Sequence, residues 1–369
     1  MDVLVIGGTR YFGRGAVQQL LEAGHAVTIF SRGSTRPPFW NDIEHIEGDR
    51  TDSEGMAARL KGRRFDGVID NLCFNREEAE GVIGALRGNV GRYVAASTVS
   101  VYGEAGHALT RHTVRTALTD AERFAVDYRY LEPVRESDLD NANHPWEYRP
   151  NLDDYAEGKR HMERVMLESP DGWPWIVVRV PATLGPDDPS GRFAFWLSRI
   201  LDGDPMLLPD GGAHAVQVGF SDDLSRFLIE LLDGGGIQRS IYNYAQREAS
   251  AFVNFLQVIA DAAKKPLNAV AVPSETLLEH TDLPWQEWSY APFTCCPILM
   301  SLAKTEAEVG LSFRTSLREW VQMTVDSYLS QPERLKAAKH ADARPLEVEF
   351  AALWRTARAG LARQPESKR

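Results

Sequence analysis

Cysteine and long apolar runs are scarce in this sequence, and their scarcity excludes several classes of protein. The 369 residues include three cysteines, Cys73, Cys295 and Cys296. An odd count with one adjacent pair does not suit a disulfide framework, and the spacing does not suit a zinc site. No apolar run reaches the roughly 20 residues of a membrane-spanning helix, and the N-terminal MDVLVIGG has no basic segment before its apolar run. We therefore expect a cytoplasmic protein without a metal site.

Net positive charge is missing as well, since the formal net charge is -11. An acidic chain repels the phosphate backbone of nucleic acids, so a nucleic-acid partner is not expected without a local basic patch. Residues 331–369 are locally basic, and they contain an amphipathic helix pattern around residues 346–354. We favour a helix that docks on the protein body over a tail that binds a partner.

Strand and helix patterns alternate along the first part of the chain. Apolar strands are expected at residues 3–6, 26–30, 44–47, 67–70 and 92–96, with helices at 14–23 and 77–86. The alternation continues with helices at 153–169 and 222–232 and strands at 175–180 and 240–244. This rhythm predicts βαβ units with right-handed crossovers, and therefore an α/β fold with a Rossmann-type, doubly wound parallel sheet.

Domain boundaries are expected where this alternation stops. Residues 1–186 form a nucleotide-binding domain to which residues 215–248 return, and residues 187–214 and 249–330 form a smaller, mostly helical substrate domain. Residues 187–217 have no clear pattern and are expected to be mobile, and residues 331–369 are a C-terminal helix and tail.

A polar and aromatic stretch at residues 103–152 interrupts the nucleotide-binding domain. Such a long insertion is either a lid over an active site or a plain surface excursion. Trp146 and Tyr148 within it are candidates to cap a substrate ring. Cys73, which follows the fourth strand, either lines the cofactor pocket or is a buried, inert thiol.

The string VIGGTRYFG at residues 5–13 leads from the first strand into the first helix. Glycine lets the backbone turn tightly and approach a pyrophosphate closely, and the helix N-terminus that follows offers free N–H groups. Gly7 and Gly13 fit this role, whereas Arg10 replaces the usual middle glycine. Arg10 therefore either stretches outward along the surface or pairs with a phosphate. The turn predicts a dinucleotide cofactor.

The residues after the second and third strands predict which dinucleotide binds. The second strand ends in Ser31 and Arg32, with Arg36 nearby, where NAD sites usually have an acid. A basic residue suits a 2′-phosphate, so we expect NADP, with NAD as the alternative. Asp49 follows the third strand, where it suits the adenine edge or simply forms a turn.

A tyrosine and a lysine share one helix face near the middle of the chain. Tyr155 and Lys159 are four residues apart, so their side chains are neighbours. A phenol has a pKa near 10, and a nearby ammonium lowers it by favouring the phenolate. Tyr155 is therefore the candidate acid/base for an alcohol or ketone. Thr98, at the end of the fifth strand, offers a hydroxyl that holds the substrate oxygen.

With these motifs the chain resembles the extended short-chain dehydrogenase/reductase superfamily, in its NAD-dependent epimerase/dehydratase family, over residues 1–330. The resemblance implies a catalytic triad of Thr98, Tyr155 and Lys159, and it implies that RVPATLGP at residues 179–186 lies beside the nicotinamide. Thr98 and Tyr155 are further apart than is usual, because of the insertion. The segment before Gln217 lacks an arginine for a nucleotide diphosphate, which puts a nucleotide-sugar substrate in doubt.

The cofactor-binding residues expected from the sequence and the resemblance lie at the ends of successive strands. They are Gly7, Thr9, Arg10, Tyr11, Phe12, Gly13, Ser31, Arg32, Asp49, Arg50, Asn71, Leu72, Ser97, Lys159, Val180 and Pro181.

These residues predict an NAD(P)-dependent oxidoreductase or epimerase that acts at a secondary alcohol or ketone carbon of a sugar-like or other small molecule. Two other functions stay open. The strings GGTRYFGR, FSRG and GDRTD resemble a side branch that includes chloroplast stem-loop RNA-binding proteins, although RNA-associated members lack the tyrosine retained here. A non-catalytic NAD(P) sensor is the third possibility. A homodimer is possible through the helix that carries Met162, Val165 and Met166.

Overall fold

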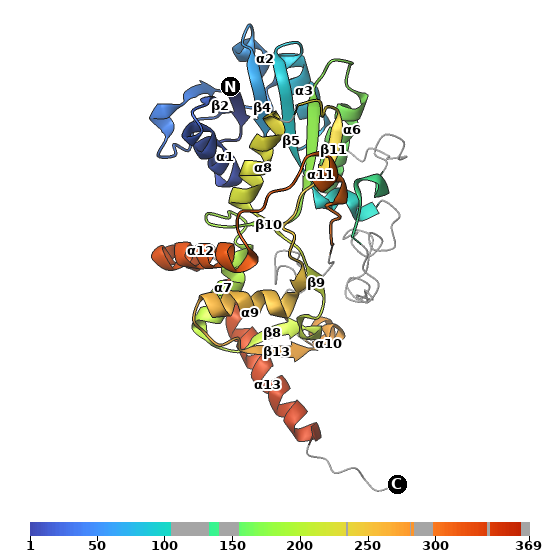
Figure 1. Ribbon diagram of the computed structural model, residues 1–369. Helices are drawn as coiled ribbons and strands as arrows, with labels where there is room; N and C mark the ends of the chain where they lie inside the picture. Colours follow the sequence, from blue (N-terminus) through green and yellow to red (C-terminus); the bar gives the residue numbers. More distant parts are fainter. Residues whose placement is uncertain are drawn as a thin grey trace.

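The computed structural model describes most of the chain as two lobes, one above the other in Figure 1. The described residues are 1–104, 133–139, 155–233, 235–280, 282–283, 298–337 and 340–362. The sheet lobe contains the N-terminus and the large sheet. The second lobe lies below it in Figure 1 and ends in the C-terminal helix.

Seven parallel strands form the sheet, in the order β11-β6-β5-β4-β1-β2-β3. They are β1 (Asp2–Ile6), β2 (Ala26–Ser31), β3 (Glu44–Glu47), β4 (Phe65–Asp70), β5 (Val90–Thr98), β6 (Trp175–Val180) and β11 (Ser240–Asn243). The central strands are short runs of Val, Ile and Leu because helices bury both of their faces. The strand order reverses between β1 and β4, so a crevice is expected at the carboxyl ends of these strands. We call this side of the sheet the carboxyl edge.

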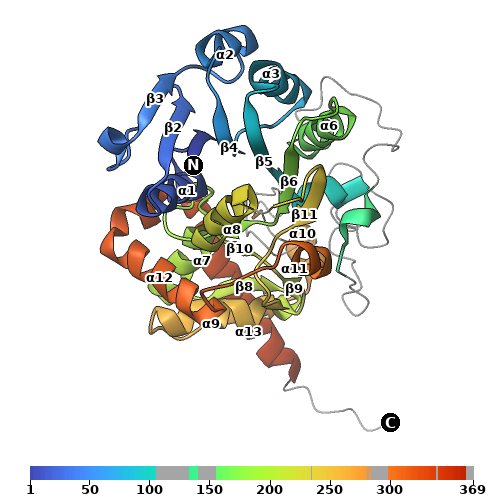
Figure 2. The same ribbon diagram turned by 45° about the horizontal axis from the view of Figure 1, so that its top comes forward.

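Helices cover both faces of the sheet (Figure 2). One face carries α1 (Tyr11–Glu22) and α8 (Ser221–Asp233). The other face carries α2 (Ser53–Leu60), α3 (Arg76–Leu86) and α6 (Tyr155–Glu168). The expected Rossmann-type fold is therefore confirmed, with strand and helix boundaries close to those that the sequence predicts.

The second lobe is built around one apolar core of helices and a small sheet. Its main elements are α7 (Arg192–Asp202), α9 (Phe252–Ala262), α12 (Leu317–Ser330), α13 (Arg344–Ala362) and the parallel pair β8 (Met206–Pro209) and β13 (Ala269–Val272). Shorter elements complete the described chain: β7 (Thr183–Leu184), β9 (Ala215–Val216), β10 (Gly219–Phe220), β12 (Ser250–Ala251), α10 (Ser274–His280), α11 (Ala303–Glu308), and the 3-10 turns η1 (Trp40–Asp42), η2 (Val99–Glu104), η4 (Glu136–Asp138), η5 (Asp210–Gly212), η6 (Pro332–Ala337) and η7 (Ala341–Ala343).

The expectation of a mobile segment at residues 187–217 is wrong, because this segment folds into α7, β8, η5 and β9. Phe193, Leu197 and Ile200 recur at helical spacing and are fully or almost fully buried. Gly191 and Gly203 bound the helix with φ angles of 69° and 77°, a conformation that glycine adopts without strain. The apolar period was present in the sequence and was missed.

The C-terminal helix α13 docks on the second lobe, as the sequence predicts. Trp354 donates its Nε1–H to the carbonyl of Ala271 at 3.1 Å. The buried carboxylate of Glu347 pairs with Arg199 at 2.8 Å and accepts from the backbone N–H of Leu207 at 3.1 Å. A buried ion pair with a further donor fixes the start of α13 against α7 and β8.

The middle of the 103–152 insertion is anchored on the sheet lobe. Val134 and residues 299–301 form a parallel bridge through two backbone hydrogen bonds of 2.8 Å. Glu136 accepts from the backbone N–H of Asn243 at 2.7 Å, at the edge of β11. The candidate ring-capping residues Trp146 and Tyr148, and the pair Cys295 and Cys296, lie outside the described residues.

The three apolar residues that suggested a dimer on α6 face the interior instead. Met162 and Met166 are fully buried and Val165 is 7% exposed, all within the core between α6 and the sheet. They offer no surface to a second copy, so a homodimer stays a prediction without these contacts. In the described ranges, no helix is both long and apolar enough to cross a membrane.

Candidate active site

The glycine-rich turn between β1 and α1 brings two stretches of backbone into contact. Gly7 has a φ of 89°, in the left-handed region that favours glycine. A Cβ at Gly13 would lie 2.2 Å from the carbonyl oxygen of Gly7 and 2.7 Å from Nδ2 of Asn71. Helix α1 begins at Tyr11, and the side chain of Arg10 does not cap it. Uncapped N–H groups at this helix N-terminus suit a pyrophosphate.

Asn71 follows β4 at the carboxyl edge of the sheet. The condition of its side chain shows whether a dinucleotide would fit there. The residue is 8% exposed, and neither its Nδ2 nor its Oδ1 has a hydrogen-bond partner among the described residues. The buried hydroxyl of Tyr11 also has no hydrogen-bond partner among the described residues. A buried polar group without a partner is costly, so these atoms fit a bound ligand that supplies one. Together with the glycine cradle, they fit a nicotinamide dinucleotide.

Basic side chains surround the loop that follows β2. Arg10 is exposed and donates from Nε and Nη2 to Oγ1 of Thr35, at 3.1 and 2.9 Å. It therefore extends outward along this loop. The carboxylate of Asp49 accepts from the backbone N–H and the hydroxyl of Thr51 at 2.9 and 2.8 Å. These bonds lower the pKa of Asp49, and the nearby charge of Arg32 adds to the effect. Asp49 thus forms the turn that the sequence allowed.

Two predicted cofactor-binding side chains are directed into the protein interior. Both oxygens of Asp70 accept from Nη1 of Arg50 at 2.7 Å, and Arg50 is 7% exposed. Ser97 donates its hydroxyl to Oε1 of Glu163 at 2.6 Å. Buried carboxylates hold both side chains, so the structure does not bring Arg50 or Ser97 to the cofactor-binding edge through its side chain.

The predicted catalytic residues meet at the carboxyl end of β5. Tyr155 opens α6 and is 51% exposed. Burial raises the pKa of Tyr155, and the nearby side chain of Thr98 and the charge of Arg192 oppose this rise. Fold topology thus brings together residues that are 57 positions apart in the sequence.

Lys159 is a buried cation on α6, four residues after Tyr155. Its side chain is 1% exposed, and Nζ donates to the carbonyl oxygen of Ala96 at 2.6 Å. Nζ lies 5.9 Å from the centre of the Tyr155 ring. Burial lowers the pKa of Lys159 to about 8, so the ammonium form still prevails at neutral pH.

A buried ion pair fixes helix α6 against the sheet. Arg179 on β6 and Glu163 on α6 are both fully buried and pair at 2.7 Å. Glu163 also accepts the Ser97 hydroxyl from β5. The pair therefore joins α6 to two strands, four residues beyond Lys159. Val180 and Pro181, which follow Arg179, are buried at the end of β6.

Two residues at the site were missed by the sequence reasoning. Phe74 is 39% exposed, and its ring centre lies 6.1 Å from that of Tyr155. Its position just after the carboxyl end of β4, where ligands bind in this type of fold, could have indicated Phe74 from the sequence. Arg192 opens α7, and its charge acts on the hydroxyls of both Tyr155 and Tyr11. No sequence signal pointed to Arg192, because its segment was expected to be mobile.

Cys73, which follows β4, is a buried thiol. Cys73 is fully buried, and burial raises the pKa of its thiol to about 12. It is therefore an unreactive thiol at neutral pH. Within the described ranges, no cluster of three His, Cys, Asp or Glu residues has the arrangement of a metal site.

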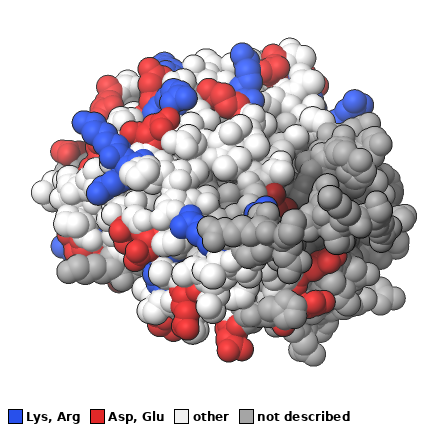
Figure 3. Space-filling view, turned by 90° about the horizontal axis from the view of Figure 1, so that it is seen from below, with Lys and Arg blue, Asp and Glu red and all other residues white. Residues whose placement is uncertain are grey.

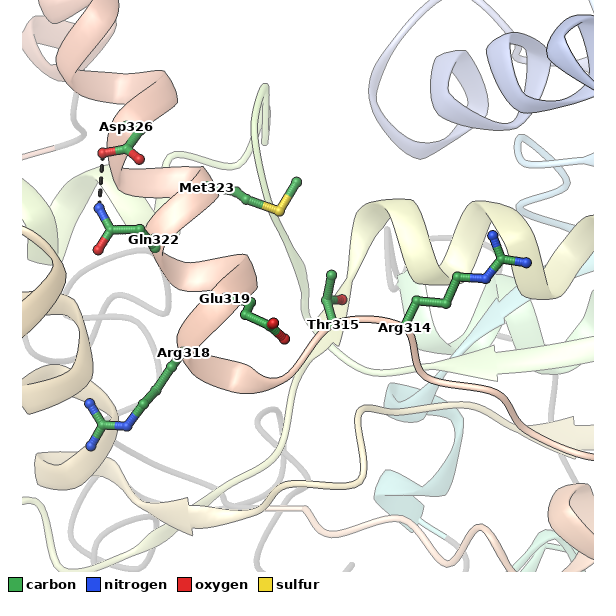
Figure 4. A pocket seen from close by; sticks show the side chains of 7 residues that line it. All are labelled: Arg314, Thr315, Arg318, Glu319, Gln322, Met323 and Asp326. Atoms are coloured by element: carbon green, nitrogen blue, oxygen red, sulfur yellow. Dashed lines mark hydrogen bonds between the residues drawn. The ribbon is translucent and has the colours of Figure 1, made fainter.

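A separate open hollow lies beside α12 in the second lobe (Figure 4). It is lined by Arg314, Thr315, Arg318, Glu319, Gln322, Met323 and Asp326. Glu319 caps the start of α12 through Ser316, and Gln322 bonds to Asp326 at 2.9 Å. Its lining includes no residue of the glycine turn or of α6, so the hollow is distinct from the site described above.

Figure 3 shows the distribution of charged side chains on one face of the second lobe, which is relevant to nucleic-acid binding. Lys and Arg side chains are interspersed there with Asp and Glu. Among the described residues, this face has no broad basic field of the kind that a phosphate backbone requires.

Comparison with known proteins shows the family of the chain. A model of the family described as NAD(P)H-binding matches residues 7–197, more than half of the chain. A 2'-dehydrokanamycin reductase of Streptomyces kanamyceticus is 26% identical over 282 residues, covering 76% of this chain and 72% of the relative. The chloroplast stem-loop binding protein of 41 kDa b of Arabidopsis thaliana is 24% identical over 277 residues, covering 72% of this chain and 64% of the relative.

Solved structures show the same fold. The UDP-glucose 4-epimerase of Thermotoga maritima has a TM-score of 0.64 and 17% identity, and the match covers 90% of this chain and 100% of that chain. The dTDP-glucose 4,6-dehydratase of Bacillus anthracis, solved with NAD, has a TM-score of 0.63 and 17% identity, with coverage of 92% and 100%. The chain therefore belongs to the NAD(P)H-binding family and shares the fold of this epimerase and this dehydratase.

Proposed function

We propose that this protein is an NADP-preferring oxidoreductase that interconverts a secondary alcohol and a ketone on a sugar-like small molecule, with Tyr155 as the acid/base. One observation carries the proposal: the side chain of Thr98 acts on the hydroxyl of Tyr155, and the buried ammonium of Lys159 lies 5.9 Å from the centre of the same ring. A phenol so placed can exchange a proton with a substrate oxygen at neutral pH. The similarity to a 2'-dehydrokanamycin reductase supports net reduction of a ketone on a sugar-derived ring.

The chain's residues divide the work of such a reaction. When bound, the nicotinamide supplies or accepts the hydride at the substrate carbon. In the reducing direction the carbonyl carbon gains that hydride, and its oxygen takes the hydroxyl proton of Tyr155. Thr98 holds the same oxygen in place, and Lys159 stabilises the phenolate that remains. The exposed half of Tyr155 lets water restore the proton.

The loop after β2 supports the preference for NADP. Arg10 and Arg32 are both exposed at this loop, and the bond from Arg10 to Thr35 holds its guanidinium there. A guanidinium binds a 2′-phosphate with charge-assisted hydrogen bonds. An NAD site would offer a carboxylate to the ribose hydroxyl at the end of β2, whereas this chain has Ser31 and Arg32.

The first experiment is a titration of the purified protein with NADPH and NADH, followed by protein fluorescence. We expect exchangeable binding with a clear preference for NADPH, and NADPH-dependent reduction of a ketone by the wild type. The Tyr155→Phe variant is expected to lose about a hundredfold or more in turnover while it binds NADPH normally. Tight retention of NAD(H) through purification would contradict the NADP preference, and unchanged turnover in Tyr155→Phe would exclude its acid/base role.

RNA binding is the competing function, and the similarity to a chloroplast stem-loop binding protein is the observation in its favour. The net charge of -11 opposes it. Retention of a stem-loop RNA that weakens steeply with salt, in a protein that binds neither NADPH nor NADH, would favour this alternative.

A further inference from the structure

A strip of exposed apolar side chains lies at the catalytic edge of the sheet lobe. The large hydrophobic residues that remain exposed among the described residues are Leu72, Phe74, Tyr155, Met323, Leu329, Leu346 and Leu353. The last four lie on α12 and α13 of the second lobe. In the described sheet lobe, exposure of large apolar side chains is therefore confined to the three residues at the site. An apolar patch so restricted indicates a surface that a ligand covers.

The backbone around Phe74 holds this residue firmly in place. Its N–H donates to Oε2 of Glu78 at 2.5 Å. The next residue, Asn75, caps α3 by accepting from the N–H of Glu78 at 2.9 Å. The first turn of α6 packs directly on Phe74, because a Cβ at Gly158 would lie 2.4 Å from the Phe74 carbonyl oxygen. The backbone of Phe74 is thus held between α3 and α6.

The rings of Phe74 and Tyr155 form one aromatic wall around the catalytic ammonium. Their centres are 6.1 Å apart and their planes are inclined by 52°. Nζ of Lys159 lies 4.6 Å from the centre of the Phe74 ring, closer than to the Tyr155 ring. With 39% of Phe74 still exposed, this wall combines a large apolar surface with the hydroxyl that exchanges the proton.

We propose that Phe74 is a specificity-determining residue that takes the C–H face of a saturated, sugar-like ring and so selects cyclic over open-chain substrates. The inference rests on the proposed function, because it places the reacting carbon beside the Tyr155 hydroxyl. The face of an aromatic ring is electronegative, and it suits the C–H groups that neighbouring oxygens polarise on one face of a sugar ring. A ring also loses less conformational freedom on binding than an open chain does.

The size of the effect follows from the energy of one aromatic contact. A well-formed contact on an aromatic face contributes about 0.5–1.5 kcal/mol beyond its area, which corresponds to a factor of about 2 to 12 in kcat/KM. We expect Phe74→Leu to lower the ratio of kcat/KM for cyclohexanone to that for an open-chain ketone of equal carbon number by this factor. Phe74→Tyr, which keeps the ring, is expected to keep the ratio.

A binding measurement provides a second readout without turnover. Saturation-transfer NMR with methyl glucopyranoside and the full chain in NADP⁺ is expected to show the ring C–H signals for wild type and Phe74→Tyr. These signals are expected to fall strongly in Phe74→Leu. Phe350→Leu, a matched change on α13, is the control and is expected to behave as wild type. NADPH affinity, measured for every variant, reports whether the cofactor site is intact.

The outcomes separate this inference from the proposed function. If the wild type reduces ketones but Phe74→Leu keeps both the ratio and the NMR signals, the role of Phe74 is excluded and the proposed function stands. If the wild type transfers no hydride to any carbonyl, yet the sugar contact depends on Phe74, the proposed chemistry fails and the aromatic site stands. If the wild type shows neither hydride transfer nor sugar contact, both are excluded.

Discussion

The buried ammonium of Lys159 is predicted to lower the free energy of unfolding. Replacement of Lys159 by methionine tests this prediction. An ordinary lysine has a pKa near 10.4, whereas burial lowers that of Lys159 to about 8. At pH 7 the buried ammonium therefore costs about 3 kcal/mol of folding free energy, at 1.36 kcal/mol per pKa unit. Methionine removes this cost but also the bond to the Ala96 carbonyl, which is worth about 1 kcal/mol. Lys159→Met is thus expected to be more stable by about 2 kcal/mol at pH 7.

The stability difference between wild type and Lys159→Met is expected to depend on pH. Between the folded pKa of about 8 and the unfolded pKa near 10.4, the unfolded chain binds more protons than the folded chain. The stability of the wild type therefore rises with pH through this window relative to that of the variant. The cost of the ammonium falls to about 1.4 kcal/mol by pH 9.5. The advantage of Lys159→Met is then expected to be close to zero.

The assay is urea unfolding of wild type, Lys159→Met and Lys304→Met at pH 7 and 9.5. Lys304 is partly exposed and bonds to Ser240 and the Ile241 carbonyl, so its replacement is the matched control. Lys159→Met is also expected to lose most of its ketone reduction, because it removes the ammonium to which the proposed function assigns stabilisation of the Tyr155 phenolate. A variant that is less stable at pH 7, or whose advantage persists unchanged at pH 9.5, would refute the reasoning.

Three further substitutions test the rest of the site. Gly13→Ala is expected to abolish NADPH binding in a fluorescence titration, because its Cβ would lie 2.2 Å from the Gly7 carbonyl; near-normal affinity would contradict the close backbone packing. Arg32→Ala is expected to weaken NADPH but not NADH by about tenfold or more, the value of a charge-assisted hydrogen bond; an equal loss for both cofactors would exclude a 2′-phosphate contact. Ser97→Ala is expected to lower the free energy of unfolding by about 2 kcal/mol and to leave NADPH affinity unchanged, and the reverse pattern would return Ser97 to the cofactor.

The sheet lobe could be predicted from the sequence because its signals are local. The central strands contain short apolar runs, and α6 carries apolar residues at helical spacing, such as Met162, Val165 and Met166. The turn at residues 7–13 carries its own evidence, since only glycine fits the contact between Gly13 and Gly7. The second lobe was predicted less well, because the short α7 lies between glycines in a segment rich in turn residues.

The directions of individual side chains at the site could not be predicted in the same way. Arg50 and Ser97 stand in sequence positions that suit a cofactor, yet Asp70 and Glu163 draw them inward. These carboxylates lie on elements that are 20 and 66 residues away in the chain. A sequence pattern places a residue at the end of a strand but does not show which buried charge it must neutralise.

By itself the sequence determined the alternation of strands and helices in the sheet lobe, the glycine-rich turn and the placement of Tyr155 and Lys159 on one helix face, because each of these depends on local residue spacing. Only the tertiary structure brought Thr98 to Tyr155 and placed Phe74 and Arg192 beside them. It also buried Lys159 deeply enough to lower its pKa. These features depend on contacts between distant segments and on the exclusion of water, and neither is encoded in local residue spacing.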